Sequence, residues 1–318
     1  MMKNTKFLCT SLSFLFVGMF TFLQTPTAEA SFCGVAKNSS QLARTAYNSS
    51  SSDKKKYLPS GFTYVTSYSN SKYSGGDHAY LVTSHIPLPA PRKPGEKPKI
   101  VLKKACHYVF RGLNTSKISI KSQMEEIGKM TKQTTCYTET KKSMGKCSER
   151  IYNRYKTLRT GLIKSVQNLI KKGSCDYLRI HGHSLGGSMA NLFAAELHLL
   201  DAKKFNTSFM RVYTYGSPRV FSSSDANKWH TKISVTRWVY ADKAKVVKTV
   251  YQGDMIPELP VGGYAHVGQT YMIYRRRYVT KSDVYTYEKK SRQWLAKHGL
   301  GWKHDVAHYA EGISKGCK

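Results

Sequence analysis

The stretch from Tyr177 to Gly187 constrains the fold of this chain more than any other, because it reads Tyr-Leu-Arg-Ile-His-Gly-His-Ser-Leu-Gly-Gly. A short, mostly apolar run leads into Gly-His-Ser-Leu-Gly, and small residues at helical spacing follow. A serine between a strand and a helix, with a glycine two residues to either side, is typical of a strained turn that exposes the hydroxyl. The pattern predicts that Ser184 is a nucleophile. Because a serine hydroxyl is weakly nucleophilic, it also predicts a histidine base, an acid and backbone donors for an oxyanion.

The rest of the chain alternates between strand and helix patterns. Apolar residues recur at three-four spacing between Ser148 and Lys171, which predicts a long helix there. Further patterns predict a helix over Val35–Tyr47, a hairpin over Phe62–Val82, strands over Ile100–Leu102, Cys106–Phe110, Phe209–Tyr215, Thr249–Tyr251 and Tyr271–Tyr287, and a final helix after Gly299. Serine-rich Asn48–Ser52 and proline-rich Pro87–Pro98 are expected to be loops. This alternation predicts an α/β fold with a mainly parallel central sheet flanked by helices.

The first thirty residues have the pattern of a secretory signal peptide. Lys3 and Lys6 precede an uncharged, mostly apolar stretch, and Ala28-Glu29-Ala30 offers small residues for cleavage. We therefore expect residues 1–30 to be a signal peptide, residues 31–318 to form one domain, and the product to be secreted, either extracellular or periplasmic.

Six cysteines remain after such a cleavage, which favours disulfide bonds in an exported protein. Fifteen pairings are open, and the shortest separation is between Cys136 and Cys147, which we expect to pair. No Cys-x-x-Cys spacing occurs, so neither a zinc site nor a redox site is indicated, and no cofactor is expected.

The chain is strongly basic, with 51 Lys and Arg against 19 Asp and Glu, a net charge of +32. A field of this sign favours anionic surfaces such as lipid head groups or envelope polysaccharide, although the charge also fits a role in solubility alone. No nucleic-acid-binding motif accompanies it, so nucleic acid is not an expected partner.

Several runs, in order, resemble the class 3 (fungal-type) lipases, a family with the α/β-hydrolase fold. The matching runs are Phe110–Gly112, Gly182–Gly187, Tyr213–Val220, Gly253–Pro260, and His304 ahead of Tyr309. The resemblance implies Ser184 as nucleophile, Asp254 as triad acid and His304 as general base. It also implies oxyanion donors at the backbone N–H groups of Leu185 and Leu113.

Some positions depart from the family pattern or leave an alternative open. Leu113 stands where the family commonly has Ser or Thr, and Phe221 replaces a usual glycine. Residues Trp238–Lys248 look like an insertion before the acid. His308 is a second candidate base, and Asp242 is a second candidate acid.

The family places a mobile helix over the site after the oxyanion strand, which here corresponds to residues 114–146. Met124, Ile127 and Met130 would form the apolar face of such a lid.

The resemblance implies a secreted serine hydrolase that cleaves lipid esters at an interface by a Ser-His-Asp acyl-enzyme mechanism, as triacylglycerol lipases do. A phospholipase A1 acting on anionic membranes is one alternative. A catalytically silent, basic surface-binding protein with the same fold is another.

Overall fold

The computed structural model describes most of the chain beyond the predicted signal peptide. The described residues are 27–48, 50–70, 77–89, 97, 99–113, 125, 128–241, 254, 256–260, 262–274, 277–280 and 304–316. The predicted signal peptide lies almost wholly outside them. In the part of the chain that the structure describes, no helix combines the length and hydropathy that a membrane span requires.

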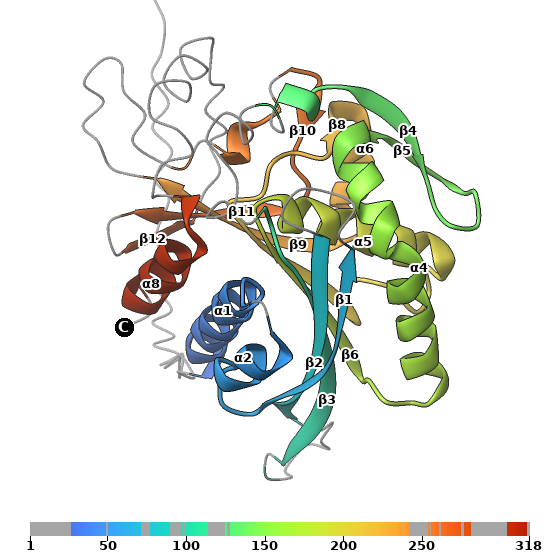
Figure 1. Ribbon diagram of the computed structural model, residues 1–318. Helices are drawn as coiled ribbons and strands as arrows, with labels where there is room; N and C mark the ends of the chain where they lie inside the picture. The colour runs from blue at the N-terminus through green and yellow to red at the C-terminus, as the bar shows by residue number, and fades with distance from the viewer. Residues whose placement is uncertain are drawn as a thin grey trace, which may run out of the picture.

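The centre of the molecule is an eight-stranded sheet in the order β1-β2-β3-β6-β7-β9-β11-β12 (Figure 1). Its strands are β1 (Phe62–Asn70), β2 (Asp77–Pro89), β3 (Ile100–Phe110), β6 (Tyr177–His183), β7 (Met210–Tyr215), β9 (Ser234–Ala241), β11 (Gln269–Tyr274) and β12 (Arg277–Thr280). The five strands from β3 to β11 are parallel to one another, whereas β1, β2 and β12 pair antiparallel at the edges. The predicted mainly parallel sheet is confirmed.

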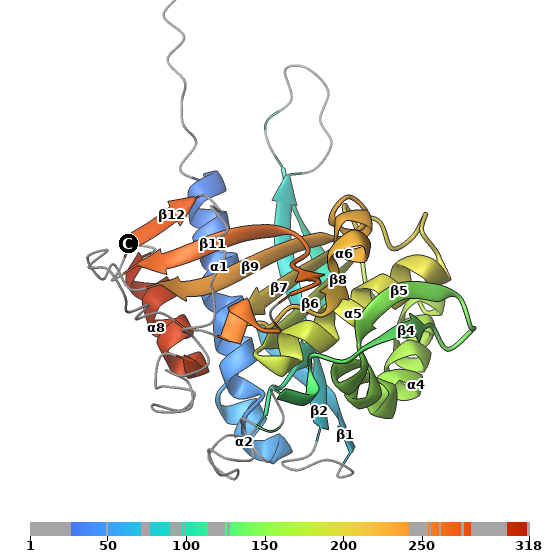
Figure 2. The same cartoon turned by 90° about the horizontal axis from the view of Figure 1, so that it is seen from above.

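Helices cover both faces of this sheet, so the molecule has three layers (Figures 1 and 2). Helices α1 (Thr27–Thr45) and α8 (Val306–Gly316) pack together on one face. Helices α4 (Glu149–Lys171) and α5 (Leu185–Leu200) pack on the other. A hydrophobic core lies on each side of the sheet, and successive residues of β2 point into opposite cores. Tyr80 and Val82 pack on the side of α1, whereas Leu81 packs on the side of α5.

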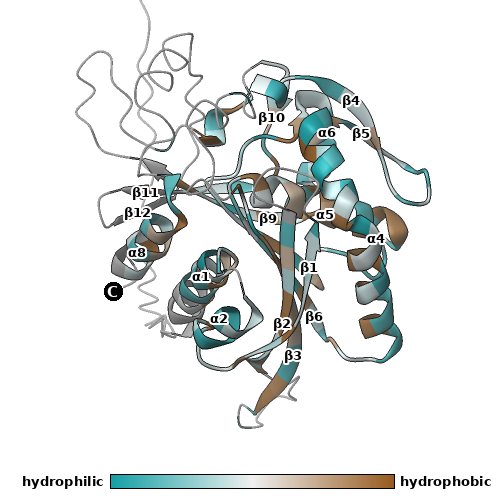
Figure 3. Ribbon diagram, viewed as in Figure 1, coloured by the Kyte–Doolittle hydropathy of each residue, from teal (hydrophilic) through white to brown (hydrophobic). Residues whose placement is uncertain are grey.

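The hydropathy pattern accounts for this layering (Figure 3). Helix α4 buries a stripe of apolar residues that includes Ile151, Tyr155, Leu158 and Leu162, whereas α5 is buried along most of its length. The start of β3 is apolar and yet exposed, with Ile100 at 63% and Leu102 at 66% of full exposure.

A second, four-stranded sheet was not anticipated from the sequence. It has the order β10-β8-β5-β4 and consists of β10 (Tyr264–Ala265), β8 (Phe221–Ser222), β5 (Ser143–Ser148) and β4 (Gln133–Tyr137). Phe221, noted above as a departure from the family pattern, is fully buried here and pairs with Cys147 and Ala265.

Two disulfides are present among the described residues. Cys136 pairs with Cys147 across β4 and β5, which confirms the expected pairing, and Cys106 pairs with Cys175. A disulfide typically contributes roughly 2–4 kcal/mol to the free energy of unfolding. The first bridge therefore fixes the β4–β5 hairpin of the small sheet.

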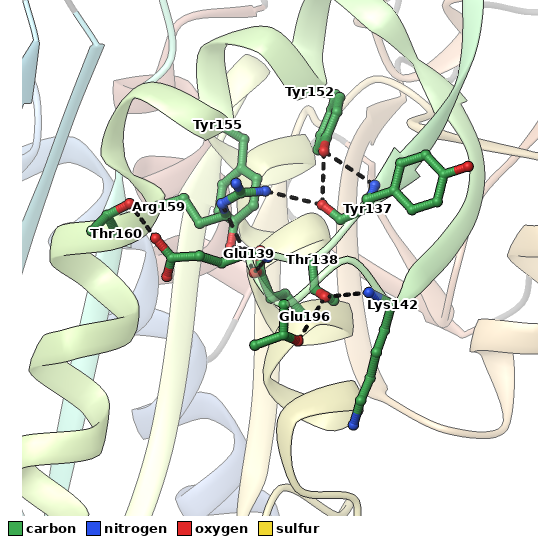
Figure 4. A network of polar contacts seen from close by, with 10 residues as sticks. Tyr137, Thr138, Glu139, Lys142, Tyr152, Tyr155, Arg159, Thr160 and Glu196 are labelled. Carbon is green, nitrogen blue, oxygen red and sulfur yellow. Dashed lines mark hydrogen bonds and ion pairs between the residues drawn. The ribbon is translucent and has the colours of Figure 1, made fainter.

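A buried carboxyl group anchors the same hairpin to the helices (Figure 4). Glu196 of α5 accepts hydrogen bonds from the backbone N–H of Glu139 at 2.5 Å and from the Tyr155 hydroxyl at 2.8 Å. The Tyr152 hydroxyl and Arg159 both donate to the Tyr137 carbonyl, at 2.7 and 2.9 Å. Side chains of α4 and α5 thus hold the hairpin in place.

This anchor predicts a pH-dependent effect on stability. Burial raises the pKa of Glu196 above its ordinary value. As the pH rises above about 4.3, Glu196 therefore loses its proton in the unfolded chain before it does so in the folded protein. Ionisation of Glu196 thus lowers the free energy of unfolding increasingly until the pH passes the pKa of Glu196 in the folded protein. Glu196→Gln keeps an acceptor and removes the titration. We expect its melting temperature, relative to wild type, to be higher at pH 7 than at pH 4. A difference that is constant across this range in thermal scans would contradict the prediction.

Four expectations about local structure need correction. Residues expected to form a serine-rich loop instead begin a short helix, α2 (Ser51–Lys56), because Ser50 caps it by accepting from the Asp53 N–H. The proline-rich excursion starts later than expected, since β2 continues through Pro89. The expected insertion Trp238–Lys248 begins inside β9, where Trp238 is fully buried between β7 and β11.

The fourth correction concerns the predicted lid. Met130 is buried in the main core at 4% exposure, and residues 133–146 of the expected lid form most of the β4–β5 hairpin of the small sheet rather than a helix. Met124 and Ile127 lie outside the described residues, as does the predicted strand Thr249–Tyr251.

Candidate active site

The turn between β6 and α5 has the strained geometry that the sequence predicts. Ser184 adopts φ 56° and ψ −135°, and its N–H donates to the Tyr215 carbonyl at 2.8 Å. Cβ atoms at Gly182 or Gly186 would overlap neighbouring backbone atoms, so both positions require glycine. A non-glycine residue at positive φ is costly and persists only when the surrounding structure enforces it.

The three residues predicted as a triad lie in hydrogen-bond contact. His304 Nε2 is 2.7 Å from Ser184 Oγ, and His304 Nδ1 is 2.8 Å from Asp254 Oδ2. All three residues are buried. They come from three separate elements: the β6–α5 turn, the segment before the 3-10 helix η2 (Ile256–Glu258), and the residue pair before α8. One imidazole therefore joins a hydroxyl to a carboxylate.

Two further groups hold the carboxylate of Asp254. Its Oδ1 accepts from the Ile256 backbone N–H at 2.9 Å, and its Oδ2 accepts from the Tyr309 hydroxyl at 2.5 Å. Since Oδ2 also faces His304 Nδ1, the orientation of the carboxylate is fixed from three sides. The sequence pattern used Tyr309 only to locate the histidine, and its contact with the acid was missed.

The two predicted oxyanion residues lie in different elements, Leu113 in the loop after β3 and Leu185 at the start of α5. Leu185 is the first residue of α5, so its N–H lies at the positive end of the helix dipole. Gly112 lies against the serine, since a Cβ there would be 2.7 Å from Ser184 Cβ. Leu113 follows it and is buried in the main core at 7% exposure. This loop and the N-terminus of α5 thus flank Ser184.

Of the two alternative site residues, His308 is described by the structure and Asp242 is not. The contact with Ser184 and Asp254 is made by His304, whereas His308 lies within α8, where its backbone N–H donates to the Asp305 carbonyl. Asp242 lies outside the described residues.

Contacts between the remaining sequence runs hold the site together. Ser188 of α5 donates to the Pro218 carbonyl at 2.7 Å. Arg219 forms a 2.6 Å ion pair with Glu258, and its backbone N–H donates to the Leu259 carbonyl. The runs around Ser184, Pro218 and Asp254 therefore form one continuous assembly.

Comparison with known proteins identifies the family of part of the chain. The family model "Lipase (class 3)" matches residues 108–263. This part of the chain belongs to the class 3 lipase family. A lipase from Rhizomucor miehei is 29% identical over 121 residues, which is 37% of this chain and 30% of that relative. The match thus spans less than a third of the relative's length.

Solved structures support the α/β-hydrolase fold over most of the chain. One is a mutant form of MDLA from Penicillium cyclopium, with TM-score 0.58, 17% identity, and coverage of 89% of this chain and 97% of that one. Another is a triacylglycerol lipase whose title describes a serine protease triad, with TM-score 0.55, 18% identity, and coverage of 85% and 91%.

Proposed function

We propose that this class 3 lipase is a secreted serine hydrolase that cleaves carboxylic esters of lipids. The observation that carries the proposal is the His304 imidazole, which lies between the Ser184 hydroxyl at 2.7 Å and the Asp254 carboxylate at 2.8 Å. The match to the class 3 lipase family supports an ester of a lipid as the substrate class.

In the proposed mechanism, His304 Nε2 accepts the hydroxyl proton while Ser184 Oγ attacks the ester carbonyl. The Leu185 and Leu113 backbone N–H groups stabilise the oxyanion that forms. The tetrahedral intermediate collapses, the alcohol leaves with the proton from His304, and an acyl-enzyme remains. Water then attacks the acyl carbon, His304 takes the proton of that water, and the fatty acid is released as Ser184 regains its hydrogen.

Asp254 has a separate role in this mechanism. It accepts the Nδ1 proton of His304, which leaves Nε2 free to act as the base and stabilises the imidazolium during each proton transfer. The Tyr309 hydroxyl and Ile256 N–H bonds support this role, because they keep the carboxylate oriented toward the imidazole.

The disulfides Cys106–Cys175 and Cys136–Cys147 support secretion, since such bonds persist in oxidising compartments. We propose that residues 1–30 are a signal peptide and that residues 31–318 form one domain. Sequencing the N-terminus of the exported protein tests it, and a mature chain that begins at Met1 would contradict it.

The substrate class is tested by release of fatty acid from a soluble short-chain ester, triolein and phosphatidylcholine under the same conditions. Hydrolysis of triolein with little release from phosphatidylcholine would identify a triacylglycerol lipase. The opposite ranking would identify a phospholipase A1. No hydrolysis of any of the three would favour the catalytically silent surface-binding protein.

The net charge of +32 favours action on anionic interfaces, which is the second candidate function. Each basic residue near an anionic lipid surface contributes about 1 kcal/mol, and salt screens this attraction over a Debye length of about 10 Å at 0.1 M. We therefore expect hydrolysis of anionic vesicles to fall steeply as salt is raised from about 0.02 to about 0.5 M, while hydrolysis of a soluble neutral ester hardly changes. Equal rates on neutral and anionic vesicles at low salt would show that the charge serves another purpose.

A further inference from the structure

A chain of hydrogen bonds that the triad does not use connects the oxyanion loop to the backbone of the base. Tyr47, just after α1, has its hydroxyl 2.6 Å from Nδ1 of His183, the residue before the nucleophile. His183 Nε2 is 2.7 Å from the backbone carbonyl oxygen of His304. At the other end, the backbone of Gly112 hydrogen-bonds the Tyr47 hydroxyl. The four residues come from four different parts of the chain.

The direction of each hydrogen bond follows from the chemistry of its partners. A carbonyl oxygen only accepts, so His183 carries its proton on Nε2 and donates to His304. Nδ1 of the same ring is then an acceptor and takes the hydroxyl proton of Tyr47. The Tyr47 oxygen remains free to accept the Gly112 N–H, which agrees with the effect of that contact in lowering the pKa of the phenol. Each donor in this chain of hydrogen bonds, from Gly112 through Tyr47 and His183 to His304, therefore faces an acceptor.

The position of His183 also matters electrostatically. Its ring centroid is 4.8 Å from that of His304, so two protonated imidazoles would repel each other strongly. Burial, with the adjacent His304 as a second cause, lowers the pKa of His183 well below its usual value. His183 therefore stays neutral while its neighbour takes up a proton.

We propose that Tyr47 and His183 are positioning residues that hold the base and the oxyanion loop in register with Ser184. The inference rests on the proposed function and adds two residues to it. His183 fixes the main chain of His304, and Tyr47 ties His183 to Gly112. Gly112 precedes the predicted oxyanion donor Leu113 and lies against Ser184, where a Cβ would be 2.7 Å from the Ser184 Cβ.

The consequence of losing this connection is a slower chemical step. Both proton transfer to His304 and oxyanion stabilisation depend on sub-ångström placement, and a displacement of about 1 Å can cost about 100-fold in rate. Substrate binding in the ground state depends much less on these positions. The loss is therefore expected in kcat, with KM nearly unchanged.

The test compares Tyr47→Phe with Tyr80→Phe on a soluble short-chain ester. Tyr80 is a matched control, because its buried hydroxyl donates to the Leu42 carbonyl of α1 at 2.5 Å on the same side of the sheet, and it has no part in the triad. Tyr47→Phe releases His183 from its contact with Gly112, and a resulting displacement of less than 1 Å near Ser184 predicts a loss of about 10-fold in kcat. Tyr80→Phe should keep the wild-type kcat even if its melting temperature falls.

Two variants of His183 test whether a side-chain donor to the His304 carbonyl is what matters. His183→Gln retains a side-chain N–H that can donate to the His304 carbonyl, whereas His183→Leu retains none. We expect the glutamine variant to keep several-fold more kcat than the leucine variant.

The outcomes separate this inference from the proposed function. An inactive wild-type enzyme would refute the proposed function, and this inference with it. An active wild type with unchanged kcat in Tyr47→Phe would overturn the inference alone. Equal losses of kcat in Tyr47→Phe and Tyr80→Phe would also overturn it, since they would reflect a general loss of packing.

Discussion

Ser184→Ala and His304→Ala should each lower turnover of a soluble ester by on the order of 10⁴-fold or more. The serine variant lacks the attacking oxygen, and the histidine variant lacks the group that lies 2.7 Å from that oxygen and accepts its proton. Because the two residues act in one step, the double variant should lose little more than either single variant. The measurement is kcat under saturating substrate, with melting temperatures to show that each variant is folded.

His308→Ala is the control for this prediction. It lies four residues after the proposed base, within α8, and should retain most of the wild-type activity. Retained activity in His304→Ala together with inactive His308→Ala would contradict the assignment of the base.

Asp254→Asn should lower kcat by about 10²- to 10⁴-fold, which is less than the loss in the serine variant. Asp254 Oδ1 accepts the Ile256 N–H, so the remaining oxygen of the substituted asparagine would stay there and its amide NH₂ would face His304 Nδ1. Two donors cannot pair, and the imidazole would move its proton to Nε2. That nitrogen then no longer accepts the proton of Ser184.

The control for this variant is Asp305→Asn, which changes an exposed carboxylate next to the same histidine in sequence. Asp305 accepts the Ala307 N–H at 2.9 Å and makes no contact with the imidazole among those described. Its kcat should stay near wild type. A comparable loss in both variants, read from steady-state kinetics, would point to net charge near His304 as the cause rather than the tautomer.

Local patterns predicted the parts of the fold that depend on short-range sequence. The long helix α4, the elbow at Ser184 and the alternation that yields parallel strands were all predictable, because helix and strand periodicities are local. The pairing of Cys136 with Cys147 was also predictable, because few residues separate the two cysteines.

Features that depend on tertiary pairing were not predictable in the same way. Strand β8 is only two residues long, and it exists because β5 and β10 pair with it on either side. The sequence pattern assigns the end of β9 to an insertion, and only the position of this strand between β7 and β11 makes its role in the sheet evident.

The active site also combines residues that local sequence patterns predict with residues that only tertiary packing brings in. Ser184, Asp254 and His304 follow recognisable sequence runs, and the structure brings them into contact. Tyr47 lies outside the matched residues 108–263, and nothing in the sequence around it distinguishes it from other tyrosines. Its contact with His183 arises only when α1 packs on the sheet face beside β6.

Covalent labelling of the wild-type protein with an organophosphonate ester tests the central proposal most directly, because the reaction requires an activated serine. After digestion, mass spectrometry should locate the phosphonyl group on Ser184, at one group per chain. His304→Ala should react far more slowly under the same conditions, while His308→Ala should react at close to the wild-type rate. A wild-type protein that remains unlabelled, or that carries the group on a different serine, would contradict the proposed nucleophile.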